Sequence, residues 1–163
     1  DYTVAIADKN GCQSPIVNHR ITSPGLLSLS VNKKQNISCY NGNNGYVELK
    51  TSGGAGAFQY SKNNTTWQPS ATLDALQAGA YNFYVKDGNN CSALVAETLS
   101  QPTQLKINFN NVQPAFCSDP VGKATAVVTG GVTNYNYTWT KQNETPVLSV
   151  NASLTNVKSG MYS

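Results

Sequence analysis

Apolar residues alternate with polar ones in several short segments of the chain. The alternation is clear in residues 27–31, 46–50, 81–85 and 105–109. A period of two puts one set of side chains on a buried face and the other in water, which is typical of a β-strand. Turn-forming Gly, Asn, Asp and Pro residues separate the segments, because these residues reach or fix the backbone angles that a turn needs. Short strands at this spacing predict β-sandwich domains.

The chain also repeats itself with a period close to eighty residues. Residues 1–12 match residues 80–91, with Tyr, Asp, Asn and Cys recurring in the same order and at the same spacing. Further landmarks recur after nearly the same interval: cysteines 39 and 117, Gly-Gly at 53–54 and 130–131, aromatic pairs at 58–60 and 135–137, and a Leu-x-x-Leu/Val-x-x-Gly-x-Tyr motif at 73–81 and 154–162. The interval is longest for the last motif, which we attribute to four extra residues in the loop around residues 141–145. Ordered self-similarity of this kind indicates tandem repeats.

Three units follow from this period. Residues 1–24 are the C-terminal part of one repeat, residues 25–102 are a complete repeat, and residues 103–163 are the N-terminal part of a further, truncated repeat. Both ends of the chain lie inside strand-like patterns, so we expect it to be a piece of a longer protein. A sandwich of about seven strands in roughly eighty to a hundred residues has the size of an immunoglobulin-like domain. The predicted fold is therefore all-β, with tandem immunoglobulin-like (PKD-like or fibronectin-like) β-sandwich repeats.

Composition and charge narrow the class of protein. Only 12% of the residues are charged and the net charge is +3, whereas about a quarter of the residues are charged in an ordinary globular domain. A surface built from amides and hydroxyls is common in exported β-proteins. No basic stripe of the kind that binds nucleic acid occurs, so no nucleic-acid partner is expected. No apolar run approaches the roughly eighteen residues of a membrane span.

The motifs of the complete repeat resemble a known family. In order, they are Cys39-Tyr-Asn-Gly42-Asn-Asn-Gly45, Gly53-Gly54, Phe58-Gln-Tyr60, Leu76 to Tyr81, Val85-Lys-Asp87, Asn89-Asn-Cys91 and Gln101-Pro102. This succession is similar to the SprB repeat, which occurs many times in the giant gliding-motility adhesins and other surface proteins of Bacteroidetes. The family usually has Pro-Tyr after the Gly-Gly pair, where this chain has Ala57-Phe58 and Asn134-Tyr135.

The resemblance implies a function. It implies that the chain is a structural and adhesive repeat of a large secreted adhesin that takes part in gliding and surface attachment. The implied adhesin is exported by the type IX route and lies at the cell surface in association with the outer membrane. The implied partners are the type IX secretion and gliding machinery and a surface polysaccharide or other extracellular ligand, beside the neighbouring repeats of the same chain. The alternative is an accessory β-sandwich module of a large secreted polysaccharide-degrading enzyme.

The four cysteines form candidate disulfides, since free cysteine is unusual in a secreted chain. Within one repeat, Cys39 would pair with Cys91, leaving Cys12 and Cys117 to partners outside the chain or in other repeats. Across repeats, Cys12 would pair with Cys39 and Cys91 with Cys117. We favour the pair within the repeat, because a small domain gains most from a cross-link. Against it, a standard sandwich would put the first and last hairpin loops at opposite ends.

Other side chains carry weaker signals. Trp67 lies in a polar stretch without a twin in the next repeat, so it is either a cap on the core, which we favour, or an exposed aromatic that binds sugar. Tyr81 and Tyr162 occupy the position of a tyrosine corner, whose hydroxyl returns to a backbone group. The chain has one histidine, His19, and eight carboxylates; we predict no catalytic site, no metal site and no cofactor. The Asp87-Gly-Asn-Asn segment is expected to form a hairpin turn rather than a calcium loop.

Overall fold

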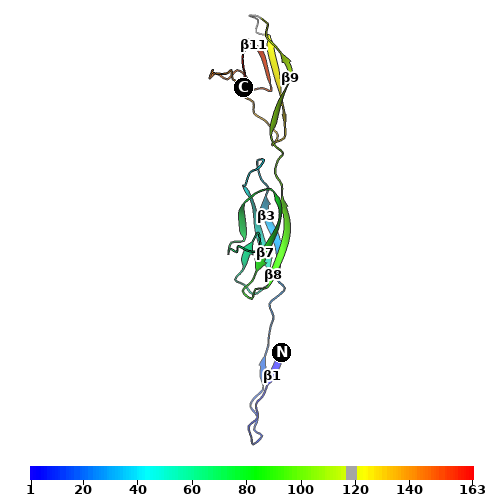
Figure 1. Cartoon of the computed structure of the whole chain (residues 1–163). Coiled ribbons are helices and arrows are strands. Elements are labelled where there is room, and N and C mark those ends of the chain that lie inside the picture. Colours follow the sequence, from blue (N-terminus) through cyan, green and yellow to red (C-terminus); the bar gives the residue numbers. More distant parts are fainter. Residues whose placement is uncertain (117–120) are drawn as a thin grey trace. The chain divides into compact units, whose positions relative to one another are not determined.

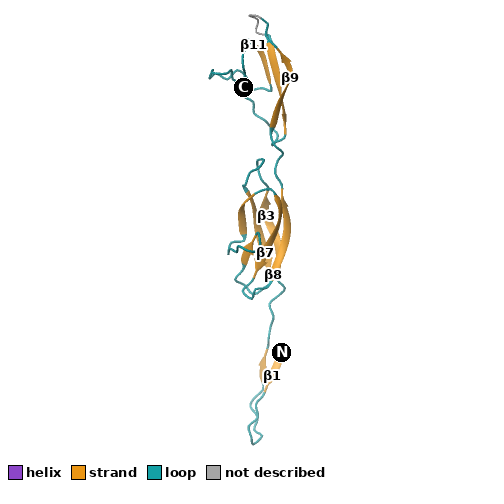
Figure 2. Cartoon of the chain, in the orientation of Figure 1, coloured by secondary structure: helices purple, strands orange, loops and turns teal. Residues whose placement is uncertain are grey.

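The computed structural model describes residues 1–116 and 121–163. Within these ranges it contains strands, turns and loops but no helix, as Figure 2 shows. The all-β prediction is therefore confirmed. The strands are β1 (Tyr2–Val4), β2 (Val17–His19), β3 (Ser28–Gln35), β4 (Gly45–Ser52), β5 (Gln59–Ser61), β6 (Thr72–Leu76), β7 (Gly79–Lys86), β8 (Ser92–Leu99), β9 (Lys106–Gln113), β10 (Gly122–Thr129) and β11 (Ser153–Val157).

These strands form four small sheets, which can be followed in Figure 1. Strands β1 and β2 form an antiparallel hairpin, with Tyr2 opposite His19. Residues 25–102, which we call the central repeat, contain the sheets β3-β4-β6 and β5-β7-β8. Residues 103–163, the third repeat, contain the antiparallel sheet β11-β10-β9 in their described part. The central repeat thus has six strands in two sheets, which fits a sandwich repeat; a seventh strand and an immunoglobulin-like topology stay predictions.

The strand positions follow the period of the sequence. Strands β9, β10 and β11 lie one period after β3, β4 and β6, and each has the same length as its counterpart. The sheet β11-β10-β9 therefore repeats the sheet β3-β4-β6, strand for strand and in the same order. The proposed boundaries at residues 24 and 102 stay predictions, since the contacts between residues divide the chain along other lines.

By its contacts the chain forms two compact units, residues 1–33, 48–73 and 82–97 in one, and residues 34–47, 74–81 and 98–163 in the other. Each unit buries apolar side chains that the period-two pattern predicts to face inward. The buried hydrophobic residues of the first unit are Leu27, Leu49, Tyr60, Leu73, Phe83 and Val85. Those of the second unit are Ile37, Val47, Leu76, Leu99, Ala126, Trp139 and Leu154.

The structure corrects one part of the repeat alignment. Tyr60 forms a β-bridge with Gln68, and the equivalent bridge in the third repeat joins Trp139 to Ser149. Both aromatic rings are buried, at 7% and 5% exposure. Trp139, and not Tyr137, is therefore the counterpart of Tyr60, so the interval between matching positions has already lengthened between β10 and this bridge. The predicted insertion of four residues is wrong as a single event: two residues enter before Trp139 and two after it.

Candidate functional site

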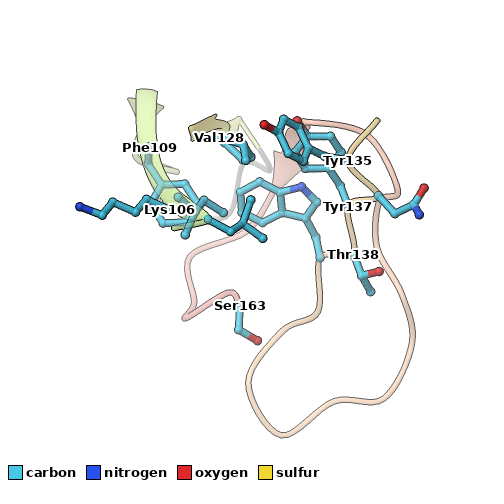
Figure 3. A pocket seen from close by; sticks show the side chains of 12 residues that line it. Lys106, Phe109, Val128, Tyr135, Tyr137, Thr138 and Ser163 are labelled. Carbon is cyan, nitrogen blue, oxygen red and sulfur yellow. The ribbon is translucent and has the colours of Figure 1, made fainter. Parts of the chain in front are cut away.

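An apolar concave surface lies on the third repeat. Two hollows of about 420 Å³ and 400 Å³ open on the sheet β11-β10-β9, and Phe109 and Trp139 line both of them. Figure 3 shows the first hollow, where Phe109, Val128, Tyr135 and Tyr137 surround the opening. The rings of Phe109 and Trp139 lie 5.7 Å apart between centroids, within the range of a favourable aromatic pair. The surface is thus suited to apolar contact.

Hydrogen bonds hold two of the aromatic side chains of this surface, Trp139 and Tyr135. The indole Nε1 of Trp139 donates to the carbonyl of Asn151 at 2.9 Å, and the hydroxyl of Tyr135 donates to the carbonyl of Gly130. No acidic residue or histidine occurs among the described residues that line the first hollow. It therefore offers shape and apolar area rather than a proton-transfer group. We did not predict this site; its signal was the run of apolar residues at alternate positions in 105–109 beside the aromatic cluster in 135–139.

Trp67 lies half-buried in the loop between β5 and β6. The ammonium of Lys86 sits 4.6 Å from the centre of its ring, a cation–π contact. The neighbouring Gln68 exchanges two backbone hydrogen bonds with Tyr60, at 2.8 Å and 3.0 Å. Part of the Trp67 side chain is covered and part faces solvent, so its predicted role as a cap on the core stays a prediction. Its role in ligand binding stays a prediction.

Asp87 organises the turn between β7 and β8. Its Oδ1 accepts hydrogen bonds from the N–H groups of Asn89 and Cys91, both at 2.9 Å, and its Oδ2 accepts one from Ala55 at 2.9 Å. Burial alone raises the pKa of this carboxyl, but the backbone donors favour the charged form more strongly, so the pKa is lowered. The carboxylate therefore stabilises the turn by accepting hydrogen bonds from backbone N–H groups, in keeping with the predicted hairpin turn.

The same turn forms in residues 8–12. The Oδ1 of Asp8 accepts from the N–H groups of Asn10 at 2.9 Å and Cys12 at 2.8 Å. The N–H of Asp8 donates to the carbonyl of Cys12 at 2.9 Å, as that of Asp87 does to Cys91 at 3.0 Å. The repeated aspartates are thus a structural signature of one turn.

The tyrosine-corner prediction is confirmed at both complete motifs. The hydroxyl of Tyr81 donates to the carbonyl of Gln77 at 3.0 Å. The hydroxyl of Tyr162 donates to the carbonyl of Lys158, four residues earlier in the same way. These two tyrosines therefore have a structural role, because each hydroxyl ties the side chain to a main-chain carbonyl four residues earlier.

The structure does not bring Cys39 and Cys91 together. Cys12, Cys39 and Cys91 are free and exposed, and Cys117 lies outside the described residues. Cys91 lies just before the first residue of β8. Cys39 lies near the other end of β8, because the carbonyl of Ser100, just past that end, accepts a hydrogen bond from the N–H of Ile37. An eight-residue strand spans about 26 Å, while a disulfide needs Cα atoms about 5.5–6 Å apart. The predicted pairing within the repeat therefore finds no support in this geometry.

Two further findings concern metal and membrane. Within residues 1–116 and 121–163, no three His, Cys, Asp or Glu side chains gather closely enough to hold a metal ion. The same ranges contain no helix that is long and apolar enough to cross a membrane.

The fold and its repeated strands define a class: a tandem all-β repeat protein. Comparison with protein families identifies the repeat, because the SprB repeat matches residues 31–66 and 110–143. The two matched segments start one period of the chain apart, and this confirms the predicted resemblance. The chain is thus a repeat module of a cell-surface protein, with an extracellular location. Among curated proteins no sequence matches it.

Proposed function

We propose that the chain is a structural and adhesive segment of a large secreted adhesin that acts in gliding and surface attachment, and that it is not itself an enzyme. The observation that carries this proposal is the SprB-repeat match at two segments one period apart. Type IX export, association with the outer membrane and contact with the gliding machinery follow from the family resemblance and belong to the same proposal.

The path of the chain through the central repeat supports a spacer role. The chain enters at β3, where the carbonyl of Gly25 accepts from the N–H of Gly54 at 2.9 Å. It leaves after β8, where the carbonyl of Ser100 accepts from the N–H of Ile37, just past the end of β3, at 2.9 Å. Entry and exit are thus separated by about the length of an eight-residue strand, roughly 26 Å. A force that pulls entry and exit apart acts along the strands, so the hydrogen bonds between neighbouring strands bear this force together.

The chemistry of the side chains supports a non-catalytic role. Catalysis needs a nucleophile, a base and a stabilising group in one pocket, and the chain has a single histidine, which is exposed on β2. The one buried carboxylate among the described residues, Asp87, accepts three backbone hydrogen bonds. It therefore holds a turn.

The test uses cells that make the parent protein. Antibodies raised against this chain should label intact cells, and the labelled sites should move along the surface of gliding cells. Deleting the segment that encodes the repeats should reduce attachment to glass or polysaccharide under flow at least several-fold. If attachment and gliding are unchanged while polysaccharide degradation is lost, the adhesin proposal is wrong and the accessory-module alternative takes its place.

Ligand binding by Trp67 is a separate part of the proposal. Aromatic rings with one free face are common sites of contact with sugars, and Trp67 is only half-buried. Trp67→Ala should reduce binding to polysaccharide at least tenfold if the repeat itself is the binding unit. Thr66→Ala, at an exposed neighbouring position, is the matched control. Equal binding by both variants removes Trp67 as a ligand site and leaves adhesion to other parts of the protein.

A further inference from the structure

The sheet β5-β7-β8 of the central repeat has an outer face that points away from the buried core. Tyr60 in β5 and Val85 in β7 lie opposite each other and are 7% and 0% exposed, so both face the core. Since successive side chains of a strand point to opposite faces of a sheet, Gln59, Tyr84 and Lys86 point outward. Both sheets of the central repeat are present. The outward positions are therefore exposed by the fold itself.

Trp67 adds an aromatic ring to this outer face. The cross-strand bridge between Tyr60 and Gln68 gives these two residues the same, inward side. Trp67 precedes Gln68 and therefore points outward, and the position of the outward-pointing Lys86 beside its ring agrees with this. In register, Trp67 and Tyr84 stand on either side of β5 in one cross-strand row, so their Cα atoms are about 10 Å apart, two strand spacings. Two aromatic side chains are thus within reach of one extended ligand.

The ammonium of Lys86 lies on this face without a carboxylate partner. Its Nζ is 4.6 Å from the centre of the Trp67 ring, so a cation–π contact places the charge beside the aromatic row. Among residues 1–116 and 121–163 no carboxylate forms an ion pair with it. The outward positions of β5, β7 and β8 hold no acidic residue, and neither does the stretch 49–73 that includes the loop of Trp67. The positive charge of this face is therefore uncompensated.

The fold of the repeat does not require these side chains. When the repeats are aligned, the first repeat has Ala5 and Ala7 where the central repeat has Tyr84 and Lys86. Both repeats still form the hairpin turn that the repeated aspartate organises. The aromatic row and its cation are thus a feature of the central repeat, and packing of the hairpin does not explain them.

We infer that the outer face of β5-β7-β8 binds a polysaccharide that carries carboxylate groups, such as a polyuronate. This inference rests on the proposed ligand-binding role of Trp67 and names the chemical class of the ligand. The apolar C–H face of a sugar ring would pack on the exposed parts of Trp67 and Tyr84. The sugar carboxylate would accept a charge-assisted hydrogen bond from Lys86, and Gln59, opposite Lys86 in β5, supplies an amide for sugar hydroxyls. A neutral polysaccharide would leave the ammonium unpaired, so the face selects acidic sugars.

The first test compares two forms of one polymer. The full chain is titrated calorimetrically with short alginate chains, and with the same alginate after its carboxyl groups have been reduced to alcohols. Alginate should bind about tenfold more tightly or better, because the reduced polymer lacks the charged acceptor, and its binding should weaken as salt is raised. Equal affinity for the two polymers, or no binding of either at millimolar concentration, overturns the inference.

Three variants locate the binding. Lys86→Gln should lower the affinity for alginate about tenfold and leave the affinity for the reduced polymer unchanged. Trp67→Ala should weaken the binding of both polymers. Lys50→Gln removes the same charge from an exposed position of β4, in the other sheet, and should bind alginate as the wild type does. Circular dichroism checks that each variant is folded at the temperature of the titration. Affinity for alginate that falls equally in Lys86→Gln and Lys50→Gln is a non-specific effect of charge and refutes the inference.

Failure of this inference can be told apart from failure of the adhesin proposal. Attachment and gliding are measured on cells, whereas alginate binding is measured on the purified chain. If cells lose attachment when the repeats are deleted but the chain binds neither polymer, the adhesin proposal stands and the inference is wrong. If alginate binding depends on Lys86 in a protein whose deletion leaves attachment unchanged, the inference stands and the adhesin proposal is wrong.

Discussion

The Gly-Gly turn after the second strand of each repeat makes a sharp prediction about stability. Gly53 has φ of +72°, and a Cβ added there would lie 2.0 Å from the carbonyl oxygen of Leu26. Gly130 in the third repeat has φ of +74° and meets the carbonyl oxygen of Gln104 at the same 2.0 Å. Alanine at either position would thus combine an unfavourable left-handed backbone with a clash against main-chain atoms.

Gly56 allows these two effects to be separated. Its φ of +70° is nearly that of Gly53, but no atom lies within 4 Å of the added Cβ. Gly56→Ala should therefore lower the free energy of unfolding only by the cost of the left-handed conformation, about 1–2 kcal/mol. Gly53→Ala should lower it by that amount and by about 1–3 kcal/mol more, the usual range for forcing atoms into filled space.

Thermal unfolding followed by circular dichroism and calorimetry measures the difference. For a domain of this size each kcal/mol lowers the melting temperature by about 4–8 °C, so Gly53→Ala should melt roughly 5–20 °C below Gly56→Ala. Both variants should keep the wild-type spectrum at low temperature. Melting temperatures of the two variants that agree within about 2 °C would refute the argument, because the close approach to Leu26 would then cost nothing.

Three further outcomes are expected. Leu76→Ala removes a side chain that is 1% exposed, and in a urea titration it should lower the free energy of unfolding of the central repeat by about 2–5 kcal/mol. In the same titration Leu94→Ala, the control at a position 58% exposed, should change this free energy by less than about 0.5 kcal/mol. Tyr81→Phe removes the hydroxyl that bonds to Gln77 and should cost about 0.5–1.5 kcal/mol, with the wild-type spectrum retained. Because the pKa of Asp87 is lowered in the folded state, its carboxylate stabilises the fold above the unfolded-state pKa, and this stabilisation is lost as pH falls through the lowered pKa. Asp87→Asn should therefore make the urea midpoint fall less steeply between neutral and acidic pH. A slope equal to that of the wild type would contradict this role of Asp87.

The strand plan could be predicted from the sequence because it rests on local signals. Alternation at 46–50 and 81–85 places strands that the structure finds at β4 and β7. The tyrosine corner could be predicted for the same reason, since Tyr81 and its carbonyl acceptor are four residues apart. Local spacing decides both features, so the repeat alignment was enough to find them.

Features that depend on three-dimensional pairing could not be predicted in this way. Spacing matched Tyr60 to Tyr137, because both are aromatic and follow the Gly-Gly turn at the same distance. The cross-strand bridge matches Tyr60 to Trp139, and only the pairing with Ser149 reveals this. The preference for a Cys39–Cys91 disulfide finds no support in the structure for a related reason. The two cysteines are separated by the length of β8, and this distance in space cannot be read from their spacing along the chain.

The corrected alignment also locates the variable part of the repeat. Strands β3, β4 and β6 keep their lengths in β9, β10 and β11, so the period changes only in the loops. One of these loops joins the residue at Tyr60 or Trp139 to the next strand, and it is two residues longer in the third repeat. In the central repeat it carries Trp67 with Lys86 above its ring; in the third it carries an ion pair between Lys141 and Glu144, with Nζ and Oε1 2.6 Å apart. A core that fixes the strands leaves this loop free to differ, so differences in ligand binding between repeats are expected to arise there.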